Sequence, residues 1–154
     1  KPIKWSARPS APTAMLTFSS SSSSWPRMAR VPIDWRQLCD RKSVELDGQV
    51  AIVKFENGRK HRVRIEETDL TLEMHAVAAR PAVLPDIVDL PLWVWRHNRS
   101  AQLVSFRIDT RGRVCGQGWV AKAGLTAEEF QLVLRRVAAE SDRLEFLLTG
   151  RDTE

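Results

Sequence analysis

Residues 125–150, which read LTAEEFQLVLRRVAAESDRLEFLLTG, contain the strongest structural signal of the chain. Thr126 followed three residues later by Glu129 is a capping box, in which each side chain bonds the backbone N–H of the other residue at a helix start. Gly150 is suited to end that helix in the left-handed conformation. Between these ends, small or apolar residues recur at helical spacing: Phe130, Val133, Leu134, Val137, Ala138, Ser141, Leu144 and Leu148. The pattern predicts a long helix whose buried face needs a sheet to cover.

Upstream of this helix, two β-like runs at residues 49–56 and 59–67 flank Asn57-Gly58. This dipeptide favours a two-residue type I′ hairpin turn, because both central positions of that turn need a positive φ. Pairing the runs about Asn57-Gly58 gives an expected core face of Val50, Ile52, Val63 and Ile65. The opposite face then mixes apolar and cationic side chains: Val53, Phe55, Lys60, Arg62 and Arg64.

The remaining elements complete an alternation of helices and strands. They are a short helix at 35–39 with Asp34 as N-cap, a strand at 70–78, a helix within 85–98 that starts after or is interrupted by Pro91, and strands at 103–109 and 114–121. A second hairpin centred between Arg111 and Gly112 would place on one face Val104, Phe106, Ile108, Cys115, Gln117 and Trp119, which makes Cys115 a core residue. The order α-β-β-β-α-β-β-α predicts an α+β fold, an antiparallel sheet of about five strands with helices on one face.

The N-terminal part differs in composition from the rest. Residues 1–31 are rich in Ser, Pro and Ala, so we expect a disordered or leader segment, with Met28 as a candidate true start. Residues 32–154 are expected to form one domain. The formal net charge is +5. Nearly all of that excess falls on residues 1–35, and because phosphate binding requires several clustered cations, nucleic acid is a disfavoured partner.

Few residues point to catalysis, metal or membrane. The three histidines, His61, His75 and His97, lack metal-ligand spacing, and the two cysteines form no CxxC pair. Gly116-Gln117-Gly118 lies in a predicted strand without the third glycine of a dinucleotide site, which indicates close packing. We therefore predict no catalytic residue, metal or cofactor. Acidic residues interrupt the apolar run at 81–95, so we expect no membrane span and a cytoplasmic protein.

Two groups of residues are candidates for partner binding. The first is the mixed hairpin face, Val53, Phe55, Lys60, Arg62 and Arg64, which would suit a peptide with apolar and acidic side chains. The alternative is that the long basic side chains only shade apolar groups from water. The second is Trp93 and Trp95, which are either core residues or binding anchors.

Three short segments resemble the type III secretion chaperone-like superfamily, and within it the YbjN-domain branch. The motifs are an Asn that ends the middle helix (Asn98), a D-x-x-G turn (Asp109 with Gly112), and a Leu-Glu pair in the last helix (Leu144 with Glu145). The resemblance implies a small, often dimeric, cytoplasmic protein that binds a client or regulatory protein without catalysis. Secretion chaperones are typically acidic, whereas this domain is near neutral, which favours the YbjN-like branch.

The sequence therefore predicts a non-enzymatic protein- or peptide-binding module that forms a homodimer. Two alternatives come from other classes, a nucleic-acid-associated regulator and an enzyme with an unrecognised site.

Overall fold

The computed structural model describes residues 33–84 and 89–150, and the predicted segment 1–31, with Met28, lies outside these ranges. In chain order the elements are the 3-10 helix η1 (Trp35–Leu38), the strands β1 (Val44–Asp47), β2 (Val50–Lys54), β3 (Lys60–Glu67) and β4 (Thr71–Ala79), the 3-10 helix η2 (Pro81–Val83), the helix α1 (Leu90–Asn98), the strands β5 (Ser105–Ile108) and β6 (Val114–Ala121), and the helix α2 (Ala127–Thr149).

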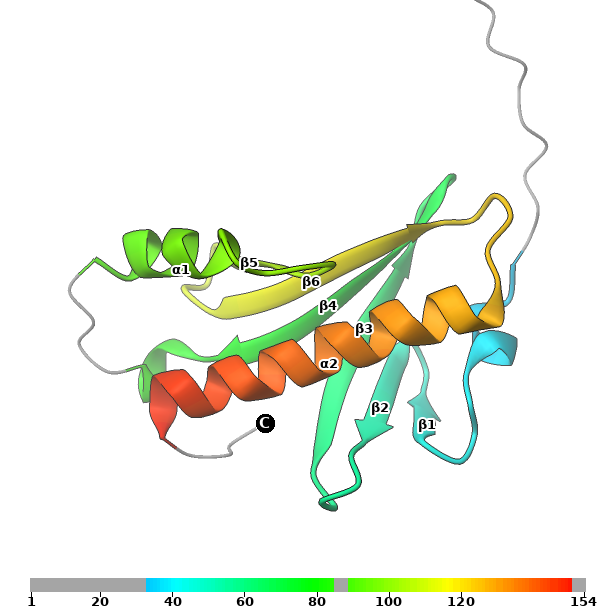
Figure 1. Ribbon diagram of the computed structural model, residues 1–154, viewed down its shortest axis with the longest axis horizontal. Helices are drawn as coiled ribbons and strands as arrows, with labels where there is room; N and C mark the ends of the chain where they lie inside the picture. The colour runs from blue at the N-terminus through cyan, green and yellow to red at the C-terminus, as the bar shows by residue number, and fades with distance from the viewer. Residues whose placement is uncertain (1–32, 85–88, 151–154) are drawn as a thin grey trace, which may run out of the picture.

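The strands form one antiparallel sheet in the order β1-β2-β3-β4-β6-β5 (Figure 1). The predicted α+β class is confirmed, with six strands in the described ranges in place of about five. The additional strand, β1, pairs with β2 and forms one edge of the sheet, while β5 forms the other.

Both α-helices lie on the same face of the sheet, as predicted. α2 packs across β3, β4 and β6 (Figure 1). α1 lies beside β5, where the ring of His97 meets the ring of Phe106 edge-on, with centroids 5.3 Å apart. Phe106 is directly opposite Gly116, and a Cβ added to that glycine would point at Ser141 of α2. The two helices therefore cover one face, and we call the other side of the sheet the open face.

The structure of α2 confirms the expected caps and buried face. Thr126 Oγ1 accepts a hydrogen bond from the Glu129 N–H at 3.2 Å, and the Thr126 N–H donates to Glu129 Oε2 at 3.1 Å. Gly150 ends the helix with φ of 64°. Every residue predicted to face the core is buried, and Glu145 is buried with them. Local periodicity and capping were therefore sufficient to predict this element.

Close packing between α2 and β6 explains the two glycines of that strand. A Cβ added to Gly118 would lie 2.8 Å from Val137 Cγ2 and 3.1 Å from Val133 Cγ1. Contacts this short require the neighbouring atoms to move, so the helix can approach the sheet only where the strand has no side chain. The close-packing interpretation of Gly116-Gln117-Gly118 is confirmed.

The predicted register of the β2–β3 hairpin is wrong by one residue. The loop has three residues, because the Gly58 N–H donates to the Phe55 carbonyl and the Phe55 N–H donates to the Arg59 carbonyl. Gly58 has φ of 84°, as in a type I turn followed by a left-handed residue. A one-residue slip reverses the relative faces of two strands. The core face of this hairpin therefore consists of Ala51, Val53, His61, Val63 and Ile65.

The β5–β6 hairpin departs from its predicted register for the same reason. The Gly112 N–H donates to the Asp109 carbonyl, the Asp109 N–H donates to the Arg113 carbonyl, and Gly112 has φ of 73°. Phe106 consequently shares its face with Gly116, while Cys115 and Trp119 lie on the open face. Cys115 is buried, as expected, but it is not part of the core beneath α2.

The other expected elements are present with small changes. η1 begins after Asp34, whose side chain accepts from the Arg36 N–H at 3.2 Å. β4 buries alternate residues, as predicted for the strand at 70–78. α1 starts at Leu90, one residue before Pro91, and runs through it without interruption, so the expectation that the helix starts after or is interrupted by Pro91 is wrong. Proline is accommodated there because in the first turn it removes no helical hydrogen bond. Residues 85–88 of that predicted helix lie outside the described ranges.

Candidate functional site

The structure separates the residues of the predicted mixed face. Val53 is only 2% exposed and belongs to the core, and Phe55 is half-buried against it. Lys60, Arg62 and Arg64 are exposed on the open face. The separation follows from the corrected register, since β2 presents its side chains to the opposite faces from those expected, whereas β3 keeps its predicted faces.

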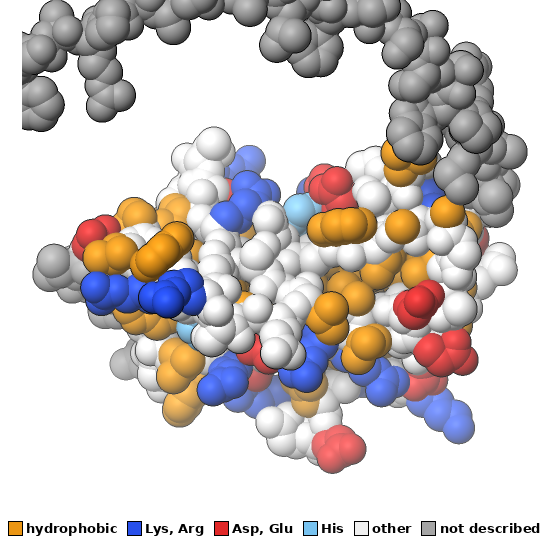
Figure 2. Space-filling view, turned by 45° about the horizontal axis from the view of Figure 1, so that its top comes forward, with side chains coloured by type: hydrophobic (Ala, Val, Ile, Leu, Met, Phe, Trp, Pro, Cys, Tyr) orange, Lys and Arg blue, Asp and Glu red, His pale blue; other side chains and the backbone are white. Residues whose placement is uncertain are grey.

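The two predicted tryptophan anchors have different environments. Trp93 is half-buried, and its ring stacks on His97 with centroids 5.5 Å apart. Trp95 is exposed, with the Arg99 guanidinium 5.5 Å from its ring centroid. Of the two tryptophans, Trp95 is therefore the one accessible to a partner. Figure 2 shows that hydrophobic side chains on the face in view lie in separate groups with Lys and Arg side chains between them.

A mixed apolar and cationic surface does exist, but it is built from other residues of β2. Val50 lies directly opposite Arg64, and Ile52 lies directly opposite Arg62, both pairs on the open face. The cations have acidic neighbours: Arg62 Nη2 is 3.0 Å from Asp47 Oδ2, and Arg64 Nε is 2.9 Å from Glu66 Oε1. This half of the open face is thus largely neutralised by its own ion pairs.

The other half of the open face contains a hollow with a volume of about 600 Å³. Its walls include Glu73 and His75 from β4, Leu103 from the segment before β5, Ser105 at the start of β5, and Gln117 and Trp119 from β6. Trp119 is 68% exposed and Leu103 57% exposed, so two large apolar side chains meet solvent around one hollow. Exposed aromatic and aliphatic groups beside a recess are typical of a protein-binding surface.

Polar side chains of this hollow bond mainly to one another. Gln117 Nε2 donates to Ser105 Oγ at 3.1 Å. His75 Nε2 lies 3.6 Å from Glu73 Oε2. Neither pair places a nucleophile beside an orienting base, and the groups offer hydrogen bonds and charge to a ligand. The arrangement is suited to binding.

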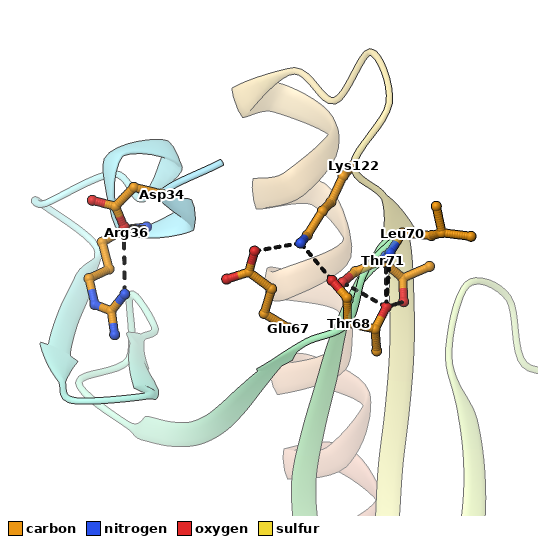
Figure 3. A network of polar contacts seen from close by, with 7 residues as sticks. All are labelled: Asp34, Arg36, Glu67, Thr68, Leu70, Thr71 and Lys122. Atoms are coloured by element: carbon orange, nitrogen blue, oxygen red, sulfur yellow. Dashed lines mark hydrogen bonds and ion pairs between the residues drawn. The ribbon is translucent and has the colours of Figure 1, made fainter. Parts of the chain in front are cut away.

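The β3–β4 turn is joined by polar contacts to Lys122, the residue that follows β6 (Figure 3). Thr68 Oγ1 accepts hydrogen bonds from the N–H groups of Leu70 and Thr71. Lys122 Nζ donates to the Thr68 carbonyl at 2.6 Å and forms an ion pair with Glu67. These bonds tie the turn to the end of β6, so the strands that carry Glu73 and Trp119 are joined at this end as well as by the ladder.

Sequence reasoning missed Trp119 and Leu103 as site residues. The predicted register put Trp119 on the face of Phe106, which is covered by the helices. The signal that could have found it is the D-x-x-G sequence of the turn, Asp109 with Gly112, which marks a three-residue loop.

One cluster beneath α2 contains residue types that bind metal ions. Ligand atoms of His61, Asp142 and Glu145 lie within 4.8 Å of one another. The Arg59 guanidinium is 2.8 Å from Asp142 Oδ1, so an organic cation already neutralises part of the cluster. We interpret the group as a buried polar contact between β3 and α2.

The two thiols are poorly suited to act as nucleophiles. Burial raises the pKa of Cys39 to about 11. Burial, followed by the nearby Asp109 carboxylate, also raises the pKa of Cys115. Both thiols are therefore protonated at neutral pH. Because the thiolate is the reactive form of cysteine, neither is suited to nucleophilic attack.

No protein-family model matches the sequence, and no curated protein does. Solved structures do match. A chain of the ExsC–ExsE complex is 21% identical, with a TM-score of 0.52, and the match covers 68% of this chain and 80% of that one. The heterodimeric ExoU–SpcU complex of the Pseudomonas aeruginosa type III secretion system gives 14% identity and a TM-score of 0.51, covering 68% and 87%. YbjN from E. coli gives 20% identity and a TM-score of 0.51, covering 73% and 85%.

The chain therefore has the type III secretion chaperone-like fold, as the sequence resemblance predicted, and YbjN shares this fold. Within the described ranges, none of the helices combines the length and apolar composition needed to cross a bilayer.

Proposed function

We propose that this protein is a non-enzymatic module that binds a client or regulatory protein through the open face of its sheet. The observation that carries the proposal is the hollow flanked by the exposed side chains of Trp119 and Leu103. The same fold in chains of the ExsC–ExsE and ExoU–SpcU complexes supports it. Among the predicted partner-binding residues, Lys60, Arg62 and Arg64 lie on this face and would border the partner.

Burial at this hollow provides the binding energy. Exposed tryptophan is the side chain that most often carries affinity at protein interfaces, and truncating such an anchor typically costs about 2 kcal/mol or more. The rim of the hollow, with Glu73, His75 and Gln117, supplies polar contacts that select a partner.

Photo-cross-linking in host cells tests the proposal. Benzoylphenylalanine replaces Ser105, which lines the hollow, and in a matched control it replaces Glu128, which is exposed on α2. We expect a polypeptide adduct at position 105 that is absent at position 128 and is lost when Trp119→Ser is added. Adducts that are identical at the two positions, or no adduct at position 105, would contradict the proposal.

We also propose a cytoplasmic homodimer. The support is the exposed apolar surface of α1, Leu92 and Trp95, beside the sheet edge formed by β5. Sedimentation equilibrium at micromolar concentration should give twice the 17.5 kDa chain mass. Trp95→Ser should shift the population toward the monomer, whereas a wild-type chain that is monomeric throughout would remove the dimer from the proposal.

A further inference from the structure

The charge distribution around Trp119 indicates which kind of partner the hollow accepts. Strand pairing places Glu66 directly opposite Glu73, and Glu73 directly opposite Trp119, all on the open face. Two carboxylates that face each other across a pair of strands repel, so this arrangement lowers the stability of the free protein. A cation bound between them would convert that repulsion into attraction.

The two carboxylates differ in how well they are neutralised. Glu66 is paired with Arg64. Glu73 has His75 as its ion-pair neighbour, and an imidazole carries charge only when it is protonated. Among residues 33–84 and 89–150, no lysine or arginine forms an ion pair with Glu73, whose side chain is 43% exposed. Glu73 is therefore the carboxylate available to a partner's cation.

Trp119 strengthens the preference for a cation. Its exposed indole stands next to Glu73 in the sheet, and tryptophan is the aromatic side chain that attracts cations most strongly. A lysine or arginine placed between the indole and the carboxylate would interact with both. An apolar side chain of the same segment would fill the hollow beside Leu103.

We infer that the partner presents an extended basic segment, in which a bulky apolar side chain fills the hollow and a lysine or arginine two residues along reaches Glu73 and Trp119. Alternate residues of an extended chain lie about 6.8 Å apart on the same side, so an apolar and a basic side chain two residues apart would both face the lining of this hollow, which includes Glu73 and Trp119. The inference rests on the proposed function and adds the chemistry of the partner. It also reverses the sequence-based expectation of an acidic partner, because the cations Arg62 and Arg64 are already paired within the protein.

Two fluorescein-labelled peptides of twelve residues provide the test. In both peptides every second residue is serine, and phenylalanine and a charged residue take turns at the positions between the serines. The charged residue is lysine in one peptide and glutamate in the other. Fluorescence anisotropy at low salt should show the lysine peptide binding the wild-type protein at least tenfold more tightly. Raising the salt concentration should reduce this difference, because solvent-exposed charges are screened.

Three variants assign the effect to the surface. Glu73→Gln should reduce the discrimination between the two peptides several-fold, and Trp119→Ser should weaken binding of the lysine peptide at least tenfold. Glu128→Gln removes an exposed carboxylate from α2, outside the open face. It should change neither the affinity for the lysine peptide nor the discrimination between the two peptides. Circular dichroism verifies that each variant is folded.

Equal or tighter binding of the glutamate peptide, or unchanged discrimination in Glu73→Gln, overturns the inference. Failure of both peptides to bind overturns it as well. The proposed function is judged separately, by the cross-linking experiment. A polypeptide adduct specific to position 105 would support the protein-binding role even if the cross-linked segment of the partner contained no basic residues, and that result would overturn only the inference about the partner's charge.

Discussion

Asn98 binds both backbone polar groups of Phe106: its Nδ2 donates to the Phe106 carbonyl oxygen at 2.8 Å, and its Oδ1 accepts from the Phe106 N–H at 2.7 Å. Phe106 lies in β5, an edge strand, where unpaired N–H and C=O groups would be a template for another strand. The side-chain amide therefore occupies the position of a neighbouring strand at the centre of this edge. The asparagine that ends the middle helix, one of the motifs behind the resemblance, thus attaches α1 to the sheet and closes an edge.

Replacing this amide should destabilise the domain and expose the edge. Asn98→Ala leaves two partly buried backbone groups of Phe106 without their partner, which typically costs about 1–3 kcal/mol. Urea unfolding should show this loss, and light scattering should show increased self-association. Ser100→Ala, which removes only an exposed hydroxyl bonded to the His97 carbonyl, is the control. Equal stability of the two variants would show that the edge does not depend on Asn98.

Local signals in the sequence predicted the caps of α2 and its buried face except for Glu145, whereas both hairpin registers were wrong by one residue. A capping box and a helical repeat can both be recognised within one continuous stretch of sequence, without knowing which strand pairs with which. The register of a hairpin depends on whether its turn has two or three residues, and Asn57-Gly58 is compatible with both. In the structure Gly58 and Gly112 each end a three-residue loop in the left-handed conformation. The short strand β1 was also missed, because its pairing with β2 is the only feature that marks its four residues as a strand.

The candidate site could not be predicted for a related reason. Its residues come from β4, β6, the start of β5 and the segment before it, and they meet only when the register is correct. With the wrong register, Trp119 was placed among core residues and Val53 among surface residues. The chemical type of one surface, apolar residues among cations, was nevertheless predicted, since Ile52 lies opposite Arg62, where Val53 was expected, and Val50 lies opposite Arg64. Opposite Lys60, however, the structure has Lys54 where Phe55 was expected.

The contact between Gly118 and α2 should be sensitive to a single methyl group. The Cβ of Gly118→Ala would lie 2.8 Å from Val137 Cγ2, and overpacking of this kind typically costs about 1–3 kcal/mol. Valine has little freedom to rotate within a helix, so the strain cannot be relieved by a side chain alone. Chemical denaturation should show the loss of stability.

A double-mutant cycle with Val137→Ala tests the cause. The double variant should be less destabilised than the sum of the two single variants, because the second substitution makes room for the added methyl. Gln117→Ala, whose side chain points to the open face, should not couple to Val137→Ala. Additive effects at Gly118 and Val137 would show that the two residues do not crowd each other.

Asp109 should make the stability of the domain depend on pH in the acid range. The hydrogen bond from the Arg113 side chain, followed by backbone N–H groups of Arg113 and Arg111, lowers the pKa of Asp109 from 3.8 to about 2. A carboxyl whose pKa is lower in the folded state stabilises the fold above its ordinary pKa, and this contribution is lost as the pH falls from about 4 to about 2. The unfolding temperature of Asp109→Asn should therefore lie below that of the wild type at pH 5, and the gap should narrow toward pH 2.

Thermal unfolding followed by circular dichroism between pH 2 and pH 5 measures this gap. Thr110→Ala, in the same turn, retains the carboxylate and should follow the wild-type pH dependence. A gap between Asp109→Asn and the wild type that stays constant over the whole range would mean that the carboxylate does not contribute through its ionisation.

The buried cluster between β3 and α2 leads to a prediction that separates two glutamates of one helix. Glu145 is fully buried near His61, whereas Glu140 is half-buried and its Oε1 lies 3.3 Å from Nη1 of the exposed Arg136, one helical turn earlier. Removing one member of a buried polar cluster leaves its neighbours without a polar partner and typically costs about 1–3 kcal/mol, while a helical pair on the surface is worth about 0.3–0.5 kcal/mol. Urea unfolding should therefore show a large loss for Glu145→Ala and a small one for Glu140→Ala. Replacing both Glu145 and His61 by leucine should restore part of the stability, because replacing both partners of a buried polar contact by apolar groups of similar shape can be nearly neutral. If Glu145→Ala is as stable as Glu140→Ala, the cluster does not hold α2 to β3.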